Sequence, residues 1–231
     1  MNIIINGGTK GIGREIALLL SNDDKNRILV TGRTEMSLKK LASQSMSGNI
    51  ATFTLDLARF DNQKEIFLEA VKTEFKAVDI LINMAGMLIV RDFMKCSEQE
   101  SREMMEVNFF GPAAVIKVLK PLMKKGSHIV NISSMGGFQG SSKYRGLSYY
   151  SASKAAISCL SECLAGEFSE SGIIVNSLAL GAVQTEMFEK AFPGSKAPVK
   201  PKEMAELIVD FAINGSKFYN GKVLPVAIGN P

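Results

Sequence analysis

Short runs of branched aliphatic residues alternate with longer amphipathic segments along this 231-residue chain, and this alternation most constrains its fold. The short runs lack the strict polar–apolar alternation of a half-exposed strand, so they predict strands buried on both faces of a parallel sheet. Helices between such strands imply right-handed crossovers. The pattern therefore predicts a single α/β domain over residues 1–231, with a doubly wound parallel sheet of about seven strands flanked by helices.

The expected strands are Asn2–Asn6, Arg27–Thr31, Ala51–Leu55, Asp79–Asn83, His128–Ile132, Ile173–Leu178 and Lys222–Ala227. The expected helices are Ile12–Ser21, Met36–Gln44, Gln63–Phe75, Gln99–Met123, Tyr150–Glu170 and Lys202–Asn214. One segment, Phe188–Pro201, contains three prolines and a glycine. Its composition is that of a loop, and its position before a helix suggests a lid over a site.

A glycine-rich turn follows the first expected strand and leads directly into the first helix. Its sequence is Asn6-Gly7-Gly8-Thr9-Lys10-Gly11-Ile12-Gly13. Glycines permit a tight turn and a close approach of backbone to a pyrophosphate, and the helix N-terminus supplies free N–H groups and a positive dipole end. In this strand–turn–helix context the turn predicts a dinucleotide-binding Rossmann fold; a glycine-rich turn without function is the alternative.

The end of the second strand bears on the choice of dinucleotide. An NAD site usually places an acidic residue about 20 positions beyond the glycines, to bind the ribose 2′-hydroxyl. Arg33 stands there instead, no acid follows before Glu35, and Lys10 in the glycine turn is a second cation. Two cations without an acid suit a 2′-phosphate, so NADP(H) is expected rather than NAD(H). The alternative is that both are solvated surface charges.

Polar or small residues end the next three strands. Asp56 follows the third strand, where it could accept a hydrogen bond from an adenine amino group, cap the following helix, or do both. Asn83-Met84-Ala85-Gly86 ends the fourth strand, where small residues let the backbone approach a ribose, unless this is an ordinary strand-ending turn. Ile132-Ser133-Ser134 ends the fifth, and a hydroxyl there could hold a carbonyl oxygen. These ends share the carboxyl edge of the sheet, where open α/β sheets bind ligands.

Tyr150 and Lys154 stand four residues apart at the head of an Ala-rich helix, so they share one helical face. An ammonium group beside a phenol favours the phenolate and lowers its pKa from about 10, which is the tuning that a proton donor near neutral pH needs. The spacing alone also arises often in surface pairs. Asn108, among apolar residues before Gly111, indicates either a helix distorted for a reason or a satisfied core amide.

In this order the motifs resemble the short-chain dehydrogenase/reductase family in its classical form, from Ile3 to about Gly229, with Asn176 and Gly181–Thr185 completing the set. The resemblance implies that Tyr150 is the general acid in reduction and the base in oxidation, and that Ser134 hydrogen-bonds the substrate oxygen. It implies that Lys154 lowers the Tyr150 pKa and binds the nicotinamide ribose. It also implies that Asn108 holds a water linking Lys154 to solvent.

The resemblance also implies a set of cofactor-binding residues, in which Thr185 and the backbone of Val183 contact the nicotinamide carboxamide. The set is Gly7, Thr9, Lys10, Gly11, Ile12, Gly13, Arg33, Asp56, Leu57, Asn83, Ala85, Gly86, Tyr150, Lys154, Gly181, Val183 and Thr185. The expected function is an NADP(H)-dependent oxidoreductase that transfers hydride reversibly between nicotinamide and a carbonyl or secondary alcohol. The substrate could be a 3-oxoacyl thioester, as in a 3-oxoacyl-ACP reductase. The alternative is a non-catalytic NADPH-binding regulatory protein on the same fold.

Three features depart from the family pattern. Met84 replaces the usual second Asn of its motif, a change expected to be tolerated because that position acts through backbone and packing. Leu180 replaces the usual Pro before Gly181, which is expected to loosen the turn beneath the nicotinamide. The interval between Ser134 and Tyr150 is longer than usual, so a loop is expected beside the substrate. Its expected lining residues are Phe138, Gln139 and Tyr144.

Composition excludes several other classes. The 27 Lys and Arg against 23 Asp and Glu leave a net charge of +4, too small an excess to indicate nucleic-acid binding. No leader precedes the first strand and no apolar run reaches about 18 residues, so a cytoplasmic protein without a membrane span is expected.

Single residues and helices support further expectations. Cys159 and Cys163 are expected as free thiols that pack on one helical face, and His128 lies in no metal-binding pattern, so no metal is expected. The helices containing Asn108 and Tyr150 form the family's usual dimer face, so a homodimer or homotetramer built through them is expected.

Overall fold

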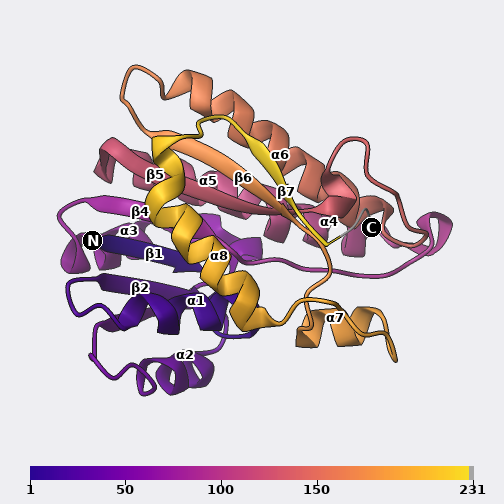
Figure 1. Ribbon diagram of the computed structural model, residues 1–231, viewed down its shortest axis with the longest axis horizontal. Helices are drawn as coiled ribbons and strands as arrows, with labels where there is room; N and C mark the ends of the chain where they lie inside the picture. Colours follow the sequence, from indigo (N-terminus) through magenta and orange to yellow (C-terminus); the bar gives the residue numbers. More distant parts are fainter. Residues whose placement is uncertain (229–231) are drawn as a thin grey trace.

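Parallel strands form a seven-stranded sheet in the computed structural model, which describes residues 1–228 (Figure 1). The strand order is β3-β2-β1-β4-β5-β6-β7. The strands are β1 Asn2–Asn6, β2 Arg27–Gly32, β3 Ile50–Thr54, β4 Val78–Asn83, β5 Met123–Ser134, β6 Ile174–Leu180 and β7 Val223–Val226. The order reverses between β1 and β4, and this reversal creates the crevice at which doubly wound sheets bind ligands. The predicted fold class and strand positions are confirmed.

Helices cover both faces of the sheet, and successive residues of one strand point to opposite layers. The helices are α1 Gly11–Ser21, α2 Glu35–Ala42, α3 Lys64–Glu74, α4 Glu98–Met105, α5 Gly111–Leu119, α6 Ser148–Glu167, α7 Glu186–Ala191 and α8 Pro201–Asn214. Ile3 and Ile5 of β1 pack in the core layer that contains α1 and α8, which lie in front of the sheet in Figure 1. Ile4 between them packs in the layer that contains α3 and α5. Burial on both faces explains the continuous apolar runs of the sequence.

The expected helix Gln99–Met123 is interrupted. It consists of α4, a π-helical turn at Glu106–Phe110, α5 and a short 3₁₀ turn at Lys120–Leu122, and Met123 already belongs to β5. Asn108 is buried in the π-helical turn, so the predicted distortion at this residue is confirmed. Such turns are frequent at functional sites.

The predicted lid contains a helix, so the expectation of a continuous loop at Phe188–Pro201 is wrong for its first part. Thr185 caps α7 by accepting a hydrogen bond from the amide of Phe188 at 3.2 Å. The rest of the segment folds back, and Val199 forms a bridge with Val183. The cap and two acidic residues in the first turn stabilise a six-residue helix that its composition obscured.

Buried amide side chains connect four strands and a helix in one hydrogen-bonded row. Thr31 donates to Asn6 at 2.9 Å, Asn6 to Asn83 at 2.7 Å, and Asn83 to Asn131 at 2.8 Å. Asn131 then donates to Ser161 of α6 at 2.9 Å. Because each buried polar group has a partner, the row fixes the register of β2, β1, β4 and β5 just before the carboxyl edge.

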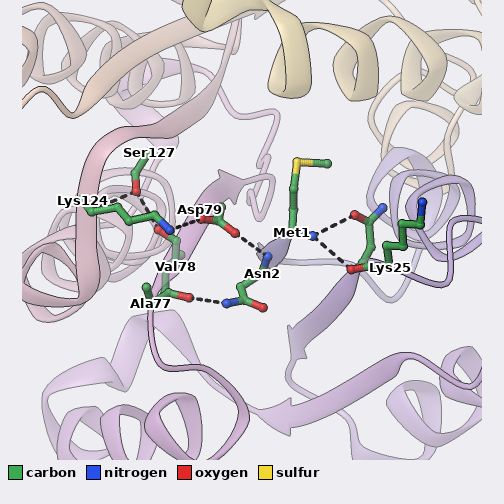
Figure 2. A network of polar contacts seen from close by, with 9 residues as sticks. Met1, Asn2, Lys25, Ala77, Val78, Asp79, Lys124 and Ser127 are labelled. Atoms are coloured by element: carbon green, nitrogen blue, oxygen red, sulfur yellow. Dashed lines mark hydrogen bonds and ion pairs between the residues drawn. The ribbon is translucent and has the colours of Figure 1, made fainter.

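A second polar network ties strands together at the opposite, amino edge of the sheet (Figure 2). The amide of Asn2 donates to Asp79 at 2.9 Å, and the side chain of Asn2 donates to the carbonyl of Ala77 at 2.8 Å. Ser127 of β5 donates to the carbonyl of Val78 at 2.8 Å. The polar groups at this edge therefore hold neighbouring strands together. No helix within residues 1–228 is long and apolar enough to cross a membrane.

Candidate active site

The glycine turn between β1 and α1 has the shape of a pyrophosphate cradle. Gly7 and Gly11 have positive φ angles of 86° and 51°, and a Cβ on Gly7 would lie 2.5 Å from the Cα of Ala85. A Cβ on Gly13 would lie 2.2 Å from the carbonyl oxygen of Gly7. The first turn of α1 carries no acidic residue, and its cap residue Lys10 makes no side-chain cap hydrogen bond. Free N–H groups and the helix dipole therefore face the turn, an arrangement that fits the phosphates of a dinucleotide.

The two cations predicted to select NADP(H) lie on neighbouring segments. A Cβ on Gly32 would lie 2.6 Å from the Cγ2 of Thr9, so the turn that carries Lys10 is packed against the strand end that carries Arg33. Both cations are exposed. Glu35, the nearest acid, pairs with Lys39 at 2.7 Å. The Lys10 ammonium is engaged by Glu186 at 3.1 Å, a contact that the sequence did not indicate.

Asp56 and Leu57 begin the short turn after β3. Asp56 accepts a hydrogen bond from the amide of Ala58 at 3.1 Å, so the capping role is the one present here. The Leu57 side chain is buried against Gly111, where a Cβ would come within 2.7 Å of the Leu57 carbonyl oxygen. Leu57 could therefore contact a cofactor only through its backbone.

Asn83, Ala85 and Gly86 end β4 beside the glycine turn. The Asn83 side chain belongs to the buried amide row, and the amide of Ala85 donates to the carbonyl of Asn6 at 2.7 Å. These contacts hold the backbone of the segment against β1. Gly86 lies against the buried end of Lys154, because a Cβ on Gly86 would be 3.4 Å from the Lys154 Nζ and 3.5 Å from the Asn108 Oδ1. Three predicted site residues, Gly86, Lys154 and Asn108, therefore lie together.

Asn108 links three segments through its side chain. Its Oδ1 accepts from the amide of Met87 at 2.7 Å, and its Nδ2 donates to the carbonyl of Met87 at 2.8 Å. The Nδ2 also donates to Ser153 at 2.9 Å, and Ser153 donates to the carbonyl of Tyr150 at 2.7 Å. Asn108 therefore fixes the segment after β4 against α6, directly behind Tyr150.

Ser153 was not among the predicted site residues, although it bonds both Asn108 and the Tyr150 carbonyl. Its position in the sequence could have indicated a role at the site, because a small polar residue three positions after Tyr150 shares a helical face with it. Ser153 is fully buried, with 0% of its surface exposed.

The two adjacent serines at the end of β5 have different roles. Ser133 is buried, donates to the carbonyl of Lys154 at 2.7 Å and accepts from Ser158 at 2.8 Å. Ser134 accepts from the amide of Gly136 at 3.1 Å, which leaves its own hydroxyl hydrogen available to donate. Ser133 is therefore engaged both as donor and as acceptor, whereas the Ser134 hydroxyl can still donate to another group.

Burial shifts the pKa values of both residues of the Tyr150–Lys154 pair. Lys154 is 4% exposed and donates to the carbonyl of Ile132 at 2.9 Å, and desolvation lowers its pKa to about 8. Desolvation also raises the pKa of the Tyr150 phenol, and the Ser134 hydroxyl offsets part of that rise. The expected lowering of the Tyr150 pKa is therefore wrong for this structure. At the phenol, loss of water outweighs the hydrogen bond with Ser134.

The segment from Gly181 to Thr185 lies over the glycine turn. The amide of Gly181 donates to the carbonyl of Val226 at 2.9 Å, and Leu180 before it is buried and paired with Val226 in the sheet. A Cβ on Gly11 would lie 3.3 Å from the Cγ2 of Thr185. The segment after β6 thus packs against the start of α1, so two predicted cofactor-binding segments that are far apart in the sequence lie next to each other. The pairing of Leu180 argues against a loosened turn.

The long loop between Ser134 and Tyr150 is fastened to the segment after β4. Arg145 donates two hydrogen bonds to Asp92, both at 2.7 Å, and Phe93 stacks on Tyr149 with ring centroids 5.4 Å apart. Beside this loop is a cavity of about 400 Å³. It is lined by Met135, Phe138, Gln139, Gly140, Ser141, Pro225 and Ala227. Phe138 and Gln139 were predicted to line such a space, whereas Tyr144 is exposed and outside it.

The remaining candidates lie outside the site. Cys159 and Cys163 are exposed on α6, so their expected role as packing residues is wrong for the isolated chain. His128 is buried; its Nδ1 lies 3.0 Å from the carbonyl oxygen of Ala212, its Nε2 lies 3.0 Å from the Nδ2 of Asn176, and burial lowers its pKa. No group of three or more His, Cys, Asp or Glu residues that could hold a metal occurs within residues 1–228.

Solved structures share this fold. A short chain dehydrogenase from Escherichia coli CFT073, complexed with NADPH, has a TM-score of 0.88 and 25% identity, with coverage of 97% of this chain and 95% of that one. A short chain dehydrogenase from Shigella flexneri, complexed with NADP, has a TM-score of 0.87 at the same identity and the same coverage of both chains. The similarity therefore extends over nearly the full length of both chains.

Sequence comparison leads to the same family. An uncharacterized oxidoreductase of Staphylococcus saprophyticus is 29% identical over 210 residues, which are 89% of this chain and 88% of that protein. The short chain dehydrogenase family matches residues 1–196. The chain therefore belongs to the short-chain dehydrogenase family of oxidoreductases, which use a nicotinamide cofactor.

Proposed function

We propose that this protein is an NADP(H)-dependent oxidoreductase that transfers hydride reversibly between nicotinamide and a carbonyl or secondary alcohol. The convergence of Tyr150, Lys154, Asn108 and Ser134 at the carboxyl edge, beside the glycine turn, carries the proposal. A non-catalytic NADPH-binding regulator would have no need for a hydroxyl donor, a tyrosine and a desolvated lysine at one point.

Proton transfer is the chemistry assigned to the chain's own residues. In reduction, Ser134 donates a hydrogen bond to the substrate carbonyl oxygen and Tyr150 gives its phenolic proton to that oxygen; in oxidation Tyr150 takes the proton back. NADPH, when bound, supplies the hydride. Lys154 would hold the nicotinamide ribose. Asn108, clamped between Met87 and Ser153, keeps α6 in place and would hold a water that resupplies the proton.

The cofactor would bind along the carboxyl edge, from the glycine turn to the start of α7. Its pyrophosphate fits the turn from Gly7 to Gly13, and its nicotinamide fits the segment from Gly181 to Thr185. Lys10 and Arg33 would bind the 2′-phosphate, which favours NADP(H) over NAD(H). The complexes of the Escherichia coli and Shigella flexneri relatives with NADPH and NADP support this choice.

The substrate would be a small molecule, and a 3-oxoacyl thioester is the first class to test. The cavity lined by Met135 and Phe138 follows Ser134 in the chain, and its mainly apolar lining suits a carbonyl compound with an apolar group. The chain would act as one cytoplasmic domain. It would assemble as a homodimer or homotetramer through the helical segments containing Asn108 and Tyr150, which are the π-helical turn with α5 and α6. Their exposed residues include Phe110 and Cys159.

Tyr150→Phe tests the proposal. The wild-type protein should oxidise NADPH with at least one member of a panel of 3-oxoacyl thioesters, ketones and aldehydes, followed by absorbance. The variant should lose most of the turnover, by about 10²- to 10⁴-fold, and still bind NADPH in a fluorescence titration. Unchanged turnover in the variant would refute the role of Tyr150. Retained NADPH binding without turnover of any substrate by the wild type would favour a regulator.

A further inference from the structure

Glu186 of α7 places a carboxylate beside the glycine turn. Its Oε2 lies 3.1 Å from the Nζ of Lys10, and both side chains are largely exposed, at 71% and 67%. The backbones on either side are held close together, because Thr185 packs over Gly11, where a Cβ would lie 3.3 Å from the Thr185 Cγ2. The ion pair therefore joins two segments whose approach is fixed by packing.

Lys10 is also one of the two cations that we assign to the cofactor 2′-phosphate. Thr9, which precedes it, packs against Gly32 beside Arg33, so the Lys10 side chain starts within the phosphate-binding region. An ammonium group on a flexible stem can follow either anion. When Lys10 is paired with Glu186, its charge is partly neutralised and its donors are directed toward α7.

We propose that Glu186 is a positioning residue that lowers selectivity for NADP(H), because its carboxylate competes with the 2′-phosphate for Lys10. The inference rests on the proposed NADP(H) preference and extends it to a residue outside the expected cofactor set. The competition involves only the 2′-phosphate. NADH has a 2′-hydroxyl in that place, so its binding should not depend on Glu186.

The expected effect is small and specific. An exposed ion pair contributes modestly, so releasing Lys10 should strengthen NADPH binding by about 1.5- to fivefold. Salt screens such contacts, so the gain should shrink at high ionic strength. A general loosening of α7 would alter both cofactors alike and would be insensitive to salt.

The experiment measures the Kd values of NADPH and NADH by fluorescence titration, at about 0.02 M and about 0.5 M salt. Glu186→Gln should lower the Kd of NADPH at low salt and leave that of NADH unchanged. Glu189→Gln is the matched control: it removes the same charge from the same helix, but Glu189 contacts Gln184, at 2.9 Å. This control should change neither Kd.

A double-mutant cycle with Lys10→Met separates the inference from the function on which it rests. The effect of Glu186→Gln should vanish in the Lys10→Met background. If Lys10→Met weakens NADPH binding but Glu186→Gln changes both cofactors equally, or still acts without Lys10, the role of Glu186 is refuted while the NADP(H) preference stands. If Lys10→Met leaves NADPH binding unchanged, both the assigned role of Lys10 and the inference are refuted.

Discussion

Replacing Lys154 with methionine removes an ammonium group that the fold holds almost entirely away from water. Methionine retains a long, unbranched side chain, so the substitution mainly removes the charge and the hydrogen bond to Ile132. The pKa of Lys154 falls from its ordinary 10.5 to about 8, because burial disfavours the charged form. The difference of 10.5 − 8 = 2.5 corresponds to roughly 3 kcal/mol, at about 1.4 kcal/mol for each pKa unit.

The sign of the pH dependence follows from this shift. Between pH 8 and 10.5 the unfolded chain keeps the Lys154 proton that the folded chain has lost, so the stability of the wild type rises with pH in this window. From pH 7 to pH 9.5 the wild type should gain about 2 kcal/mol relative to Lys154→Met, which has no proton to lose. Other titrating groups contribute to both proteins and largely cancel.

Urea unfolding followed by circular dichroism, without cofactor, measures this gain at several pH values between about 7 and 9.5. Lys40→Met provides the matched control, because Lys40 is exposed on α2, outside the helices of the proposed interface. Its stability difference from wild type should stay constant with pH. If the difference between wild type and Lys154→Met is equally constant, Lys154 is not desolvated as the structure indicates, and the reasoning about its pKa fails.

Two further predictions concern buried polar groups. Ser153→Ala removes the acceptor of one buried N–H of the Asn108 side chain, so it should cost about 1–3 kcal/mol in urea unfolding and lower kcat. Ser148→Ala at an exposed position should change neither. Equal stability of Ser153→Ala and wild type would contradict this. Because burial lowers the pKa of His128 below 6.5, its contribution to stability should be present above pH 6.5 and lost as pH falls further, so wild type should lose more stability than His128→Gln between pH 7 and 5. A parallel pH dependence of the two proteins would refute it.

The sequence predicted the sheet well because local composition reflects local burial. Each expected strand overlaps an observed one, since residues such as Ile3 and Ile4, on opposite faces, are both buried. The strand-end motifs were also located correctly, because parallel strands deliver their carboxyl ends to one edge. The order of the strands in the chain and their burial on both faces were therefore enough to predict that the candidate residues lie at one edge of the sheet.

Contacts between distant segments could not be predicted in the same way. The sequence suggested a distortion at Asn108, but its clamp on Met87 and Ser153 depends on how α4, α5 and α6 pack. The pKa of Tyr150 was predicted from the spacing of Lys154, whereas desolvation dominates it. The partner of Lys10 lies 176 residues away, so no local pattern could indicate Glu186.

The two ends of the site differ in how strongly the fold constrains them. At the chemical end, Asn108, Ser153 and Lys154 are buried and bonded to one another or to backbone, so a change there leaves an unpaired group and costs about 1–3 kcal/mol. At the phosphate end, Lys10 and Glu186 are exposed charges whose pairing contributes less than about 1 kcal/mol. On the proposed function, cofactor selectivity can therefore change through exposed residues with little effect on the fold, whereas a change in the proton-transfer geometry also lowers stability.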